Sequence, residues 1–259
     1  MRHEFPLTKA NRIKLARAFK HVPRVDMSID CVLEGQMGSA RVDDEANPTA
    51  LKIEIGPFFY FAGDPASPGG HAMLEEIIPY TLFMPSSPGW VEAAKKMYGD
   101  RLAGFERYSF SSAGISVEHL DRLGQASPFG EDVRQMDLAF AARMWGQDHF
   151  VDLSVFDSVE DFIQRGIGFY IERNGTIVGA AYSSLVCGRG IEVSIFVSEH
   201  HRRQGMATIL ASRLLQWSIE NHAEANWDAA NAESCKLAAK LGYVQTGTYQ
   251  AHYLKKSDG

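Results

Sequence analysis

Residues 200–210 read HHRRQGMATIL, and they follow closely on the apolar run IEVSIFV (191–197). The alternation of the run predicts a half-buried strand. From Ala207 to Leu214 the apolar residues recur at helical spacing, which predicts a helix as far as about residue 220. The first backbone N–H groups of a helix have no partner within it, and the helix dipole is positive there. The stretch therefore predicts an anion site between a strand and a helix.

The composition of this loop strengthens the prediction. Gly205 lets an anion approach the backbone without a Cβ in the way, and Ala207 is small for the same reason. Arg202 and Arg203 add positive charge. A basic loop with a glycine before a helix is also a common feature with no ligand, so the neighbouring segments must decide.

The first half of the chain predicts strands followed by an alternation of helices and strands. Such an order indicates a mixed sheet with helices packed on it, an α/β (α+β) fold class. The periodicity predicts helices at 7–22, 69–78 and 89–99, and strands at 28–33, 39–43, 50–55, 58–63, 80–84 and 105–110.

The second half contains a strong hairpin signal. Asn174-Gly175 supplies the positive φ angles that a two-residue turn requires, and it joins strands at 168–173 and 176–186. The remaining pattern predicts a strand at 132–136, helices at 137–146 and 159–166 (the latter capped by Asp157 or Ser158), a strand at 224–229, a helix at 232–242 and a pair of strands within 243–254. The Ser- and Gly-rich segment 111–130 suggests two domains, 1–127 and 128–259.

Charge and cysteine content exclude several classes of protein. The net charge of −6 makes nucleic acid an improbable partner and suits a small or cationic substrate. Cys31, Cys187 and Cys235 lie far apart, which argues against disulfides and thiolate metal sites and fits a reducing compartment. We expect no signal peptide and no membrane span, hence a cytoplasmic protein.

Other catalytic motifs are missing from the sequence. It has no Walker loop, no Gly-x-Ser-x-Gly elbow and no His-Glu-x-x-His helix. His200 and His201 are adjacent, so their side chains point apart, and we expect both at the loop surface. Cys235 is interpreted as a small buried thiol rather than as a nucleophile.

The Arg-x-x-Gly-x-Ala loop and the later segment NAESCKLAAKLGY (231–243) together resemble the GNAT superfamily of N-acetyltransferases. Five segments extend the resemblance to the two-domain group that includes zwittermicin A resistance proteins. They are NPTALKIEIGPFFYFAGDP (47–65), ERYSF (106–110), SVEDFIQRGIGFYIERNGTIVGAAYS (158–183), NWDAANAESCKLAAKLGY (226–243) and the tyrosines near the end.

The resemblance implies a GNAT fold in 128–259 with acetyl-coenzyme A as cosubstrate and no metal. It also implies that 1–127 is a degenerate GNAT-like α/β domain without a cofactor. The pyrophosphate loop would be Arg202, Arg203, Gln204, Gly205, Met206, Ala207 and Thr208. The pantetheine arm would lie along Ile195, Phe196 and Val197, with Asn231 and Ser234 facing the cofactor from the other side.

A general base is less clearly marked. Glu192 shares a face of its predicted strand with Ser194 and Phe196, and a carboxylate there could accept the proton of an amine. A solvated strand glutamate would show the same alternation, so that alternative stays open. Asp228 is a second candidate.

The resemblance implies transfer of acetyl to a primary amine of a small molecule in a ternary complex, with an aminopolyol-type antibiotic as one candidate. A non-catalytic acetyl-coenzyme A sensor or a pseudoenzyme is the alternative. Many GNAT enzymes carry a tyrosine seven residues after the motif Asn, where this chain has Ala238. In those enzymes the tyrosine hydroxyl can protonate the departing thiolate. Here water, Ser234, Tyr249 or Tyr253 could take its place. We therefore expect Ala238→Tyr to change kcat by less than about tenfold.

Overall fold

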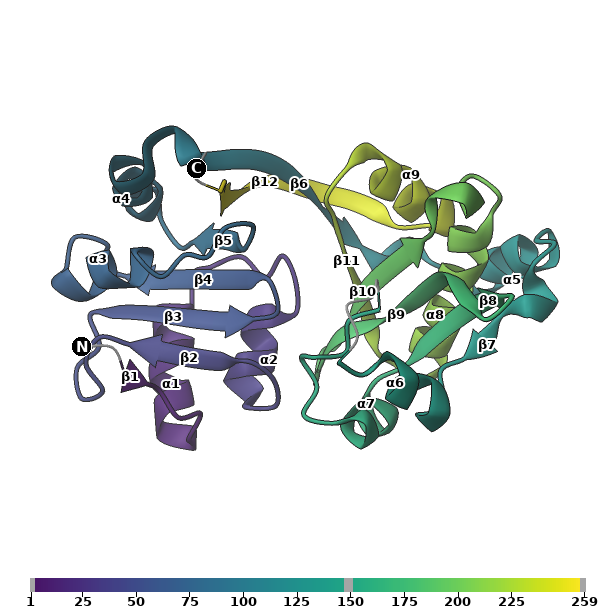
Figure 1. Ribbon diagram of the computed structural model, residues 1–259, viewed down its shortest axis with the longest axis horizontal. Coiled ribbons are helices and arrows are strands. Elements are labelled where there is room, and N and C mark those ends of the chain that lie inside the picture. The colour runs from purple at the N-terminus through teal and green to yellow at the C-terminus, as the bar shows by residue number, and fades with distance from the viewer. Residues whose placement is uncertain (1–2, 147–150, 257–259) are drawn as a thin grey trace. The chain divides into compact units, whose positions relative to one another are not determined.

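The computed structural model describes residues 3–146 and 151–256 (Figure 1). By their contacts the residues fall into two compact units. Unit 1 comprises Met1–Arg107 and Tyr249–Gly259, and unit 2 comprises Tyr108–Thr248. Both are mixed α/β structures, so the predicted fold class is confirmed.

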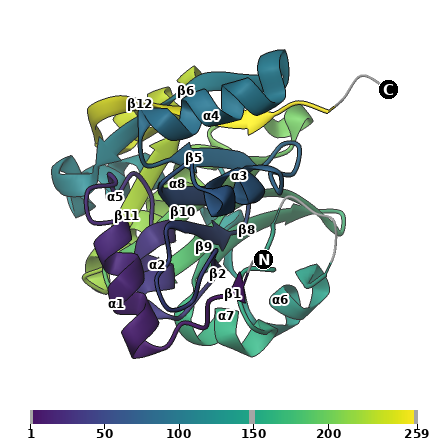
Figure 2. The ribbon, with the colours of Figure 1, turned by 90° about the vertical axis from the view of Figure 1, so that its left-hand side faces the viewer.

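Unit 1 is built on a mixed sheet. Its strands are β1 (His3–Glu4), β2 (Ser39–Val42), β3 (Ala50–Ile55), β4 (Phe58–Gly63) and β5 (Leu82–Pro85), with parts of β6 (Leu102–Ser111) and β12 (Val244–Leu254). Its helices are α1 (Lys9–Ala18), α2 (Ser28–Glu34), α3 (Pro68–Leu74) and α4 (Pro88–Tyr98). Residues of α1 and α2 share one apolar core with the sheet, and residues of α3 and α4 share another. Figure 2 accordingly shows α1 and α2 on one side of the unit 1 strands and α3 on the other.

The strand predicted at 28–33 is wrong, because this segment forms helix α2. The backbone N–H of Ser28 donates to Asp26 Oδ1 at 2.8 Å, and Gly35, at φ 74°, ends the helix in the left-handed conformation. A segment of six residues with four hydrophobic ones fits the periodicity of a strand or of a helix, so the signals at its two ends determine that it forms a helix. The strand pair predicted within 243–254 is also wrong, because β12 is one continuous strand.

Unit 2 contains β7 (Arg134–Gln135), β8 (Gly168–Arg173), β9 (Thr176–Cys187), β10 (Gly190–Val197) and β11 (Glu224–Ala229), together with the remaining parts of β6 and β12. Its helices are α5 (Val117–Gln125), α6 (Leu138–Met144), α7 (Val159–Arg165), α8 (Met206–Glu220) and α9 (Ala232–Leu241). The core is formed by α5, α8 and α9 against β8 to β11. Figure 1 shows α8 behind the strands of this unit.

Local signals set several of these elements. The predicted hairpin turn is confirmed, with φ 52° at Asn174 and 77° at Gly175. Ser158 caps α7, its side chain accepting from the backbone N–H of Asp161 at 3.2 Å. Asp137 caps α6 in the same way.

The division into units differs from the predicted ranges 1–127 and 128–259. Helix α5 belongs to unit 2, since its buried Leu120 lies in the same core as α8. The last residues belong to unit 1, where His252 of β12 pairs with Phe83 of β5. The composition along the chain cannot reveal either contact, because each one joins residues that are distant in sequence.

The two halves of the sequence repeat one order of elements. In unit 1, β2, β3 and β4 pair antiparallel, and β4 pairs parallel with β5 across helix α3. In unit 2, β8, β9 and β10 pair antiparallel, and β10 pairs parallel with β11 across helix α8. Each series then continues through a helix to a long strand, β6 or β12.

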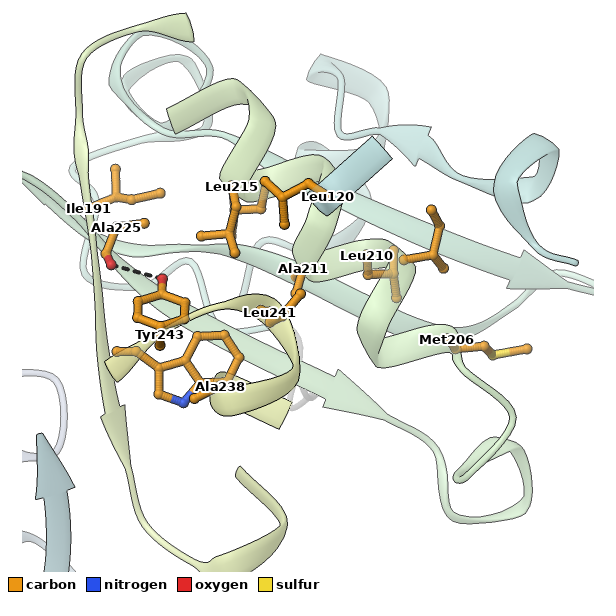
Figure 3. Packing of buried hydrophobic residues seen from close by; sticks show 14 of the residues in the cluster. Leu120, Ile191, Met206, Leu210, Ala211, Leu215, Ala225, Ala238, Leu241 and Tyr243 are labelled. Carbon is orange, nitrogen blue, oxygen red and sulfur yellow. Dashed lines mark hydrogen bonds between the residues drawn. The ribbon is translucent and has the colours of Figure 1, made fainter. Parts of the chain in front are cut away.

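Tyr243 connects the core of unit 2 to β11. Its hydroxyl donates to the carbonyl oxygen of Ala225 at 2.8 Å, a bond drawn in Figure 3. Burial raises the pKa of Tyr243 well above 10, and the negative charges of Glu192 and Glu224 raise it further. The hydroxyl therefore stays protonated and keeps this bond under ordinary conditions.

We expect Tyr243→Phe to lower the free energy of unfolding by about 1–3 kcal/mol, since it leaves a buried carbonyl without its donor. In the unfolded chain Tyr243 ionises near pH 10, whereas in the folded protein it does not. The unfolded state therefore binds fewer protons above pH 10, and stability falls as the pH rises. Urea unfolding at pH 7 and at pH 10.5 would test both statements. The variant should lose less stability between these pH values than the parent, and an equal loss would contradict the assignment.

Candidate active site

Strands β10 and β11 separate partway along their length. Their parallel pairing runs from Gly190↔Glu224 to Glu192↔Asn226. The backbone N–H of Ser198 donates to Val178 of β9 at 2.9 Å. Because successive residues of a strand direct their backbone groups to opposite edges, the Val197 carbonyl points toward the β11 side. Arg202 Nε donates to that carbonyl at 3.1 Å, so this side chain lies where the strands have separated.

The loop between β10 and α8 presents its backbone as a donor surface. Arg203 has φ 61° and Gly205 has φ 94°, a left-handed conformation at two nearby residues. Turns of this kind direct successive N–H groups into a concavity that suits an anion. Within the described residues, the backbone N–H groups of 203–208 have no hydrogen-bond acceptor. The predicted anion site thus has the donors that it requires.

A cavity of about 740 Å³ opens beside this loop. Four segments contribute to its wall: the end of β10, the loop with the first turn of α8, β11, and one face of α9. The lining residues are Ile195, Phe196, Val197, His201, Arg202, Arg203, Gly205, Met206, Ala207, Thr208, Trp227, Asn231, Glu233, Ser234, Leu237 and Lys240.

The structure brings the residues predicted for the cofactor into this one cavity, with the exception of Gln204. The side-chain amide of Gln204 donates instead to the carbonyl of His200 at 3.1 Å, so it holds the loop together. Asn231 also has a structural part, because its Oδ1 accepts from the backbone N–H of Ser234 at 2.9 Å and caps α9.

Sequence reasoning missed five residues of the wall. His201 was expected at the loop surface, but it lines the cavity, and its Nδ1 lies 2.8 Å from the Ser198 hydroxyl. Glu233, Leu237 and Lys240 belong to the same face of α9 as Ser234, so helical periodicity from Ser234 could have found them. Trp227 had no signal, since an apolar residue on β11 predicts only core.

Glu192 does not line the cavity, but it lies where β10 and β11 separate. Its side chain is only 8% exposed, and its Oε2 accepts from Asn226 Nδ2 at 2.9 Å. Its neighbours Ile191 and Val193 pack in the core between the sheet and the helices, so Glu192 lies on the opposite face of β10. The solvated alternative is therefore wrong. Asp228 follows Asn226 by two residues and shares that face of β11.

Ala238, which stands where many GNAT enzymes carry a tyrosine, does not line the cavity. Ala238 is fully buried within the core cluster, close to Leu241 and Tyr243 in Figure 3. Helix α9 instead directs Ser234 and Leu237 to the cavity. Tyr249 and Tyr253, considered as substitutes for a tyrosine hydroxyl, belong to unit 1.

We accordingly expect Ala238→Tyr to act on stability and not on catalysis alone. A phenol ring forced into a filled core costs about 1–3 kcal/mol or more. Urea unfolding would show a lowered midpoint with an unchanged slope. An unchanged midpoint would mean that the ring finds room toward the cavity.

Two other expectations concern cysteine and metals. Cys235 is half-buried, and burial raises the pKa of its thiol, which disfavours the nucleophilic thiolate. Over residues 3–146 and 151–256 no group of three His, Cys, Asp or Glu side chains is placed to hold a metal ion. No helix in the same residues is long and apolar enough to cross a membrane.

The separated parallel pair and the donor-rich helix N-terminus together offer one ligand an open strand edge and an anion site. The model of the GNAT acetyltransferase family matches residues 18–252, so the chain belongs to this family and is an N-acetyltransferase by class.

Two relatives agree with this membership, and a third solved structure shares the fold. An uncharacterized N-acetyltransferase of Bacillus subtilis (strain 168), YdfB, is 26% identical over 230 residues, which are 83% of this chain and 85% of that protein. A GCN5-related N-acetyltransferase-like protein from Streptococcus suis 89/1591 is 26% identical, with a TM-score of 0.83 over 96% of this chain and all of that chain (100%). A GNAT-family protein from Novosphingobium aromaticivorans DSM 12444, at 14% identity and a TM-score of 0.53, covers 83% of this chain and 91% of its own, and shares the fold.

Proposed function

We propose that this protein transfers an acetyl group from acetyl-coenzyme A to a primary amine of a small molecule, by direct attack within a ternary complex. The observation that carries the proposal is a set of backbone N–H groups on the wall of the cavity, those of Arg203 and of residues 205–208, which have no acceptor among the described residues. They fit the pyrophosphate of coenzyme A, and the side chains of Arg202 and Arg203 add charge beside it.

The separated edge of β10 fits the pantetheine arm. Ile195 and Val197 direct their backbone groups toward the open side. The Val197 carbonyl already accepts from Arg202, so an amide-bearing arm can pair with the N–H and C=O of Ile195 and the N–H of Val197 as an added strand. One of these N–H groups would also polarise the thioester carbonyl, stabilising the oxyanion that forms on attack.

Glu192 is our candidate for the general base. It lies at the last pair of β10 and β11, beside the point that a thioester at the inner end of the cavity would reach. A carboxylate there can accept the amine proton directly or through a water. Asp228 is the second candidate. In β11 it follows Asn226, whose side chain donates to Glu192, by two residues.

Unit 1 is proposed to be a degenerate copy of the GNAT fold. Support comes from its repeat of the strand and helix order of unit 2. The segment between β4 and α3 lacks the Arg-x-x-Gly-x-Ala sequence, so we expect one acetyl-coenzyme A per chain. The zwittermicin-type group, an aminopolyol-type acceptor and a cytoplasmic location remain parts of this proposal.

The test is release of thiol. The protein is incubated with acetyl-coenzyme A and a panel of primary amines, and free coenzyme A is measured with a thiol reagent. Release that depends on an amine supports the transferase. Binding of acetyl-coenzyme A without release, across polyamines, aminosugars and aminopolyols, would instead favour the sensor.

A further inference from the structure

Ser234 is held in the wall of the cavity by an indole. Trp227 Nε1 donates to Ser234 Oγ at 3.1 Å, and both residues line the cavity. An indole N–H can only donate, so the serine oxygen must be the acceptor in this pair. The proton of the Ser234 hydroxyl therefore points elsewhere.

None of the described residues accepts a hydrogen bond from the Ser234 hydroxyl. Two other helical serines, Ser212 and Ser218, donate to the carbonyls of Thr208 and Leu214 at 2.8 and 3.1 Å. Among the described residues, Ser234 has no such bond. Its other contact is through its backbone N–H, which donates to Asn231 Oδ1. The hydroxyl is thus left to donate to whatever occupies the cavity.

The position of Trp227 indicates which part of a bound ligand would accept this hydrogen bond from Ser234. Pairing of β10 with β11 ends at Asn226, and Trp227 is the next residue, so it lies at the inner end of the separated strands. A pantetheine arm that enters at the α8 loop and runs along β10 brings its sulfur to this end. The buried Ala238 offers no phenol there.

We propose that Ser234, oriented by Trp227, donates a hydrogen bond to the sulfur of the thioester and of the departing thiolate. Ser234 is then a catalytic residue and Trp227 a positioning residue. The inference rests on the proposed function. In the step, the amine nitrogen bonds to the thioester carbon, the C–S bond breaks, and the electron pair passes to sulfur. The serine keeps its proton, and the proton lost by the amine finally neutralises the thiolate through the base or water.

The first readout needs no acceptor amine. Coenzyme A is bound to the protein, and the pKa of its thiol is measured from the ultraviolet absorbance of the thiolate. A hydroxyl that donates to the thiolate lowers this pKa, so Ser234→Ala should raise it by about one to two pH units. Ser234→Thr keeps a hydroxyl and should stay near the parent value. Trp227→Phe, which removes only the N–H and part of the ring, should raise the pKa as Ser234→Ala does.

The charged groups of the wall are common to all of these variants. His201, Arg202, Arg203, Glu233 and Lys240 remain in place, so the difference between parent and Ser234→Ala isolates the hydroxyl. The affinity for coenzyme A should change less than about threefold, while kcat should fall about ten- to a hundredfold with KM nearly constant.

An unchanged thiol pKa with weakened coenzyme A binding would overturn the proposal, since it would place the hydroxyl on an amide or phosphate of the ligand. The proposal would also be overturned if Ser234→Thr bound coenzyme A normally but raised the thiol pKa as much as Ser234→Ala does. A parent protein that shifts the thiol pKa but acetylates no amine would contradict the proposed function and leave the contact of Ser234 with sulfur standing.

Discussion

Gly205→Glu is expected to abolish the stabilisation of the protein by acetyl-coenzyme A. A ligand at one hundred times its Kd stabilises a protein by about 2.7 kcal/mol, which a thermal unfolding scan resolves easily. Gly205 lies at the start of α8 among the unpaired N–H groups and lines the cavity. A glutamate there adds bulk and a negative charge where the pyrophosphate should bind.

The backbone of Gly205 requires a matched control. Its φ of 94° disfavours any side chain, although a Cβ would meet no atom within 4 Å. Gly205→Ala carries the same strain and a Cβ but no charge, so it should be destabilised to a similar degree and should keep part of the response to acetyl-coenzyme A that Gly205→Glu loses. An undiminished response in Gly205→Glu would refute the loop as the anion site.

Glu192→Gln should lower kcat at neutral pH by about 10²–10⁴, the typical contribution of a general base. Glutamine has nearly the same shape, and its amide oxygen can still accept from Asn226 Nδ2, so the fold and the affinity for acetyl-coenzyme A should be kept. The acidic limb of the pH–rate profile should disappear with the carboxylate. Steady-state thiol release across pH would measure both effects.

Glu224→Gln is the matched control for this variant. Glu224 is an exposed carboxylate near the start of β11, with an ion pair to Arg189 at 3.5 Å, and its amide variant should keep full activity. Full activity of Glu192→Gln would move the role of base to Asp228 or to a bound water.

Contiguous signals made much of the site predictable. The loop at 202–208 combines a glycine, two arginines and the start of a periodic helix within seven residues, so its place and its chemistry could be inferred together. Trp227 reaches the cavity only through the packing of β11, which no local pattern encodes.

The same distinction applies to the fold. The hairpin at Asn174-Gly175 depends on two residues and was predicted correctly. The membership of β12 in both units depends on pairing with β5, whose residues come about 170 positions earlier. Ala238 shows a third limit, since a family position carried over by count said nothing of how tightly the core is packed there.

The central claim is most directly tested by a single turnover with protein in excess over acetyl-coenzyme A and a reactive amine in excess over both. Mass spectrometry of the quenched mixture would follow coenzyme A, the N-acetylated amine and the intact protein. We expect coenzyme A and N-acetylated amine to appear in equal amounts and at the same rate, with no acetylated protein at any time. Coenzyme A that forms before the product, together with an acetylated protein, would contradict direct transfer. Full retention of acetyl-coenzyme A with every amine would contradict catalysis itself.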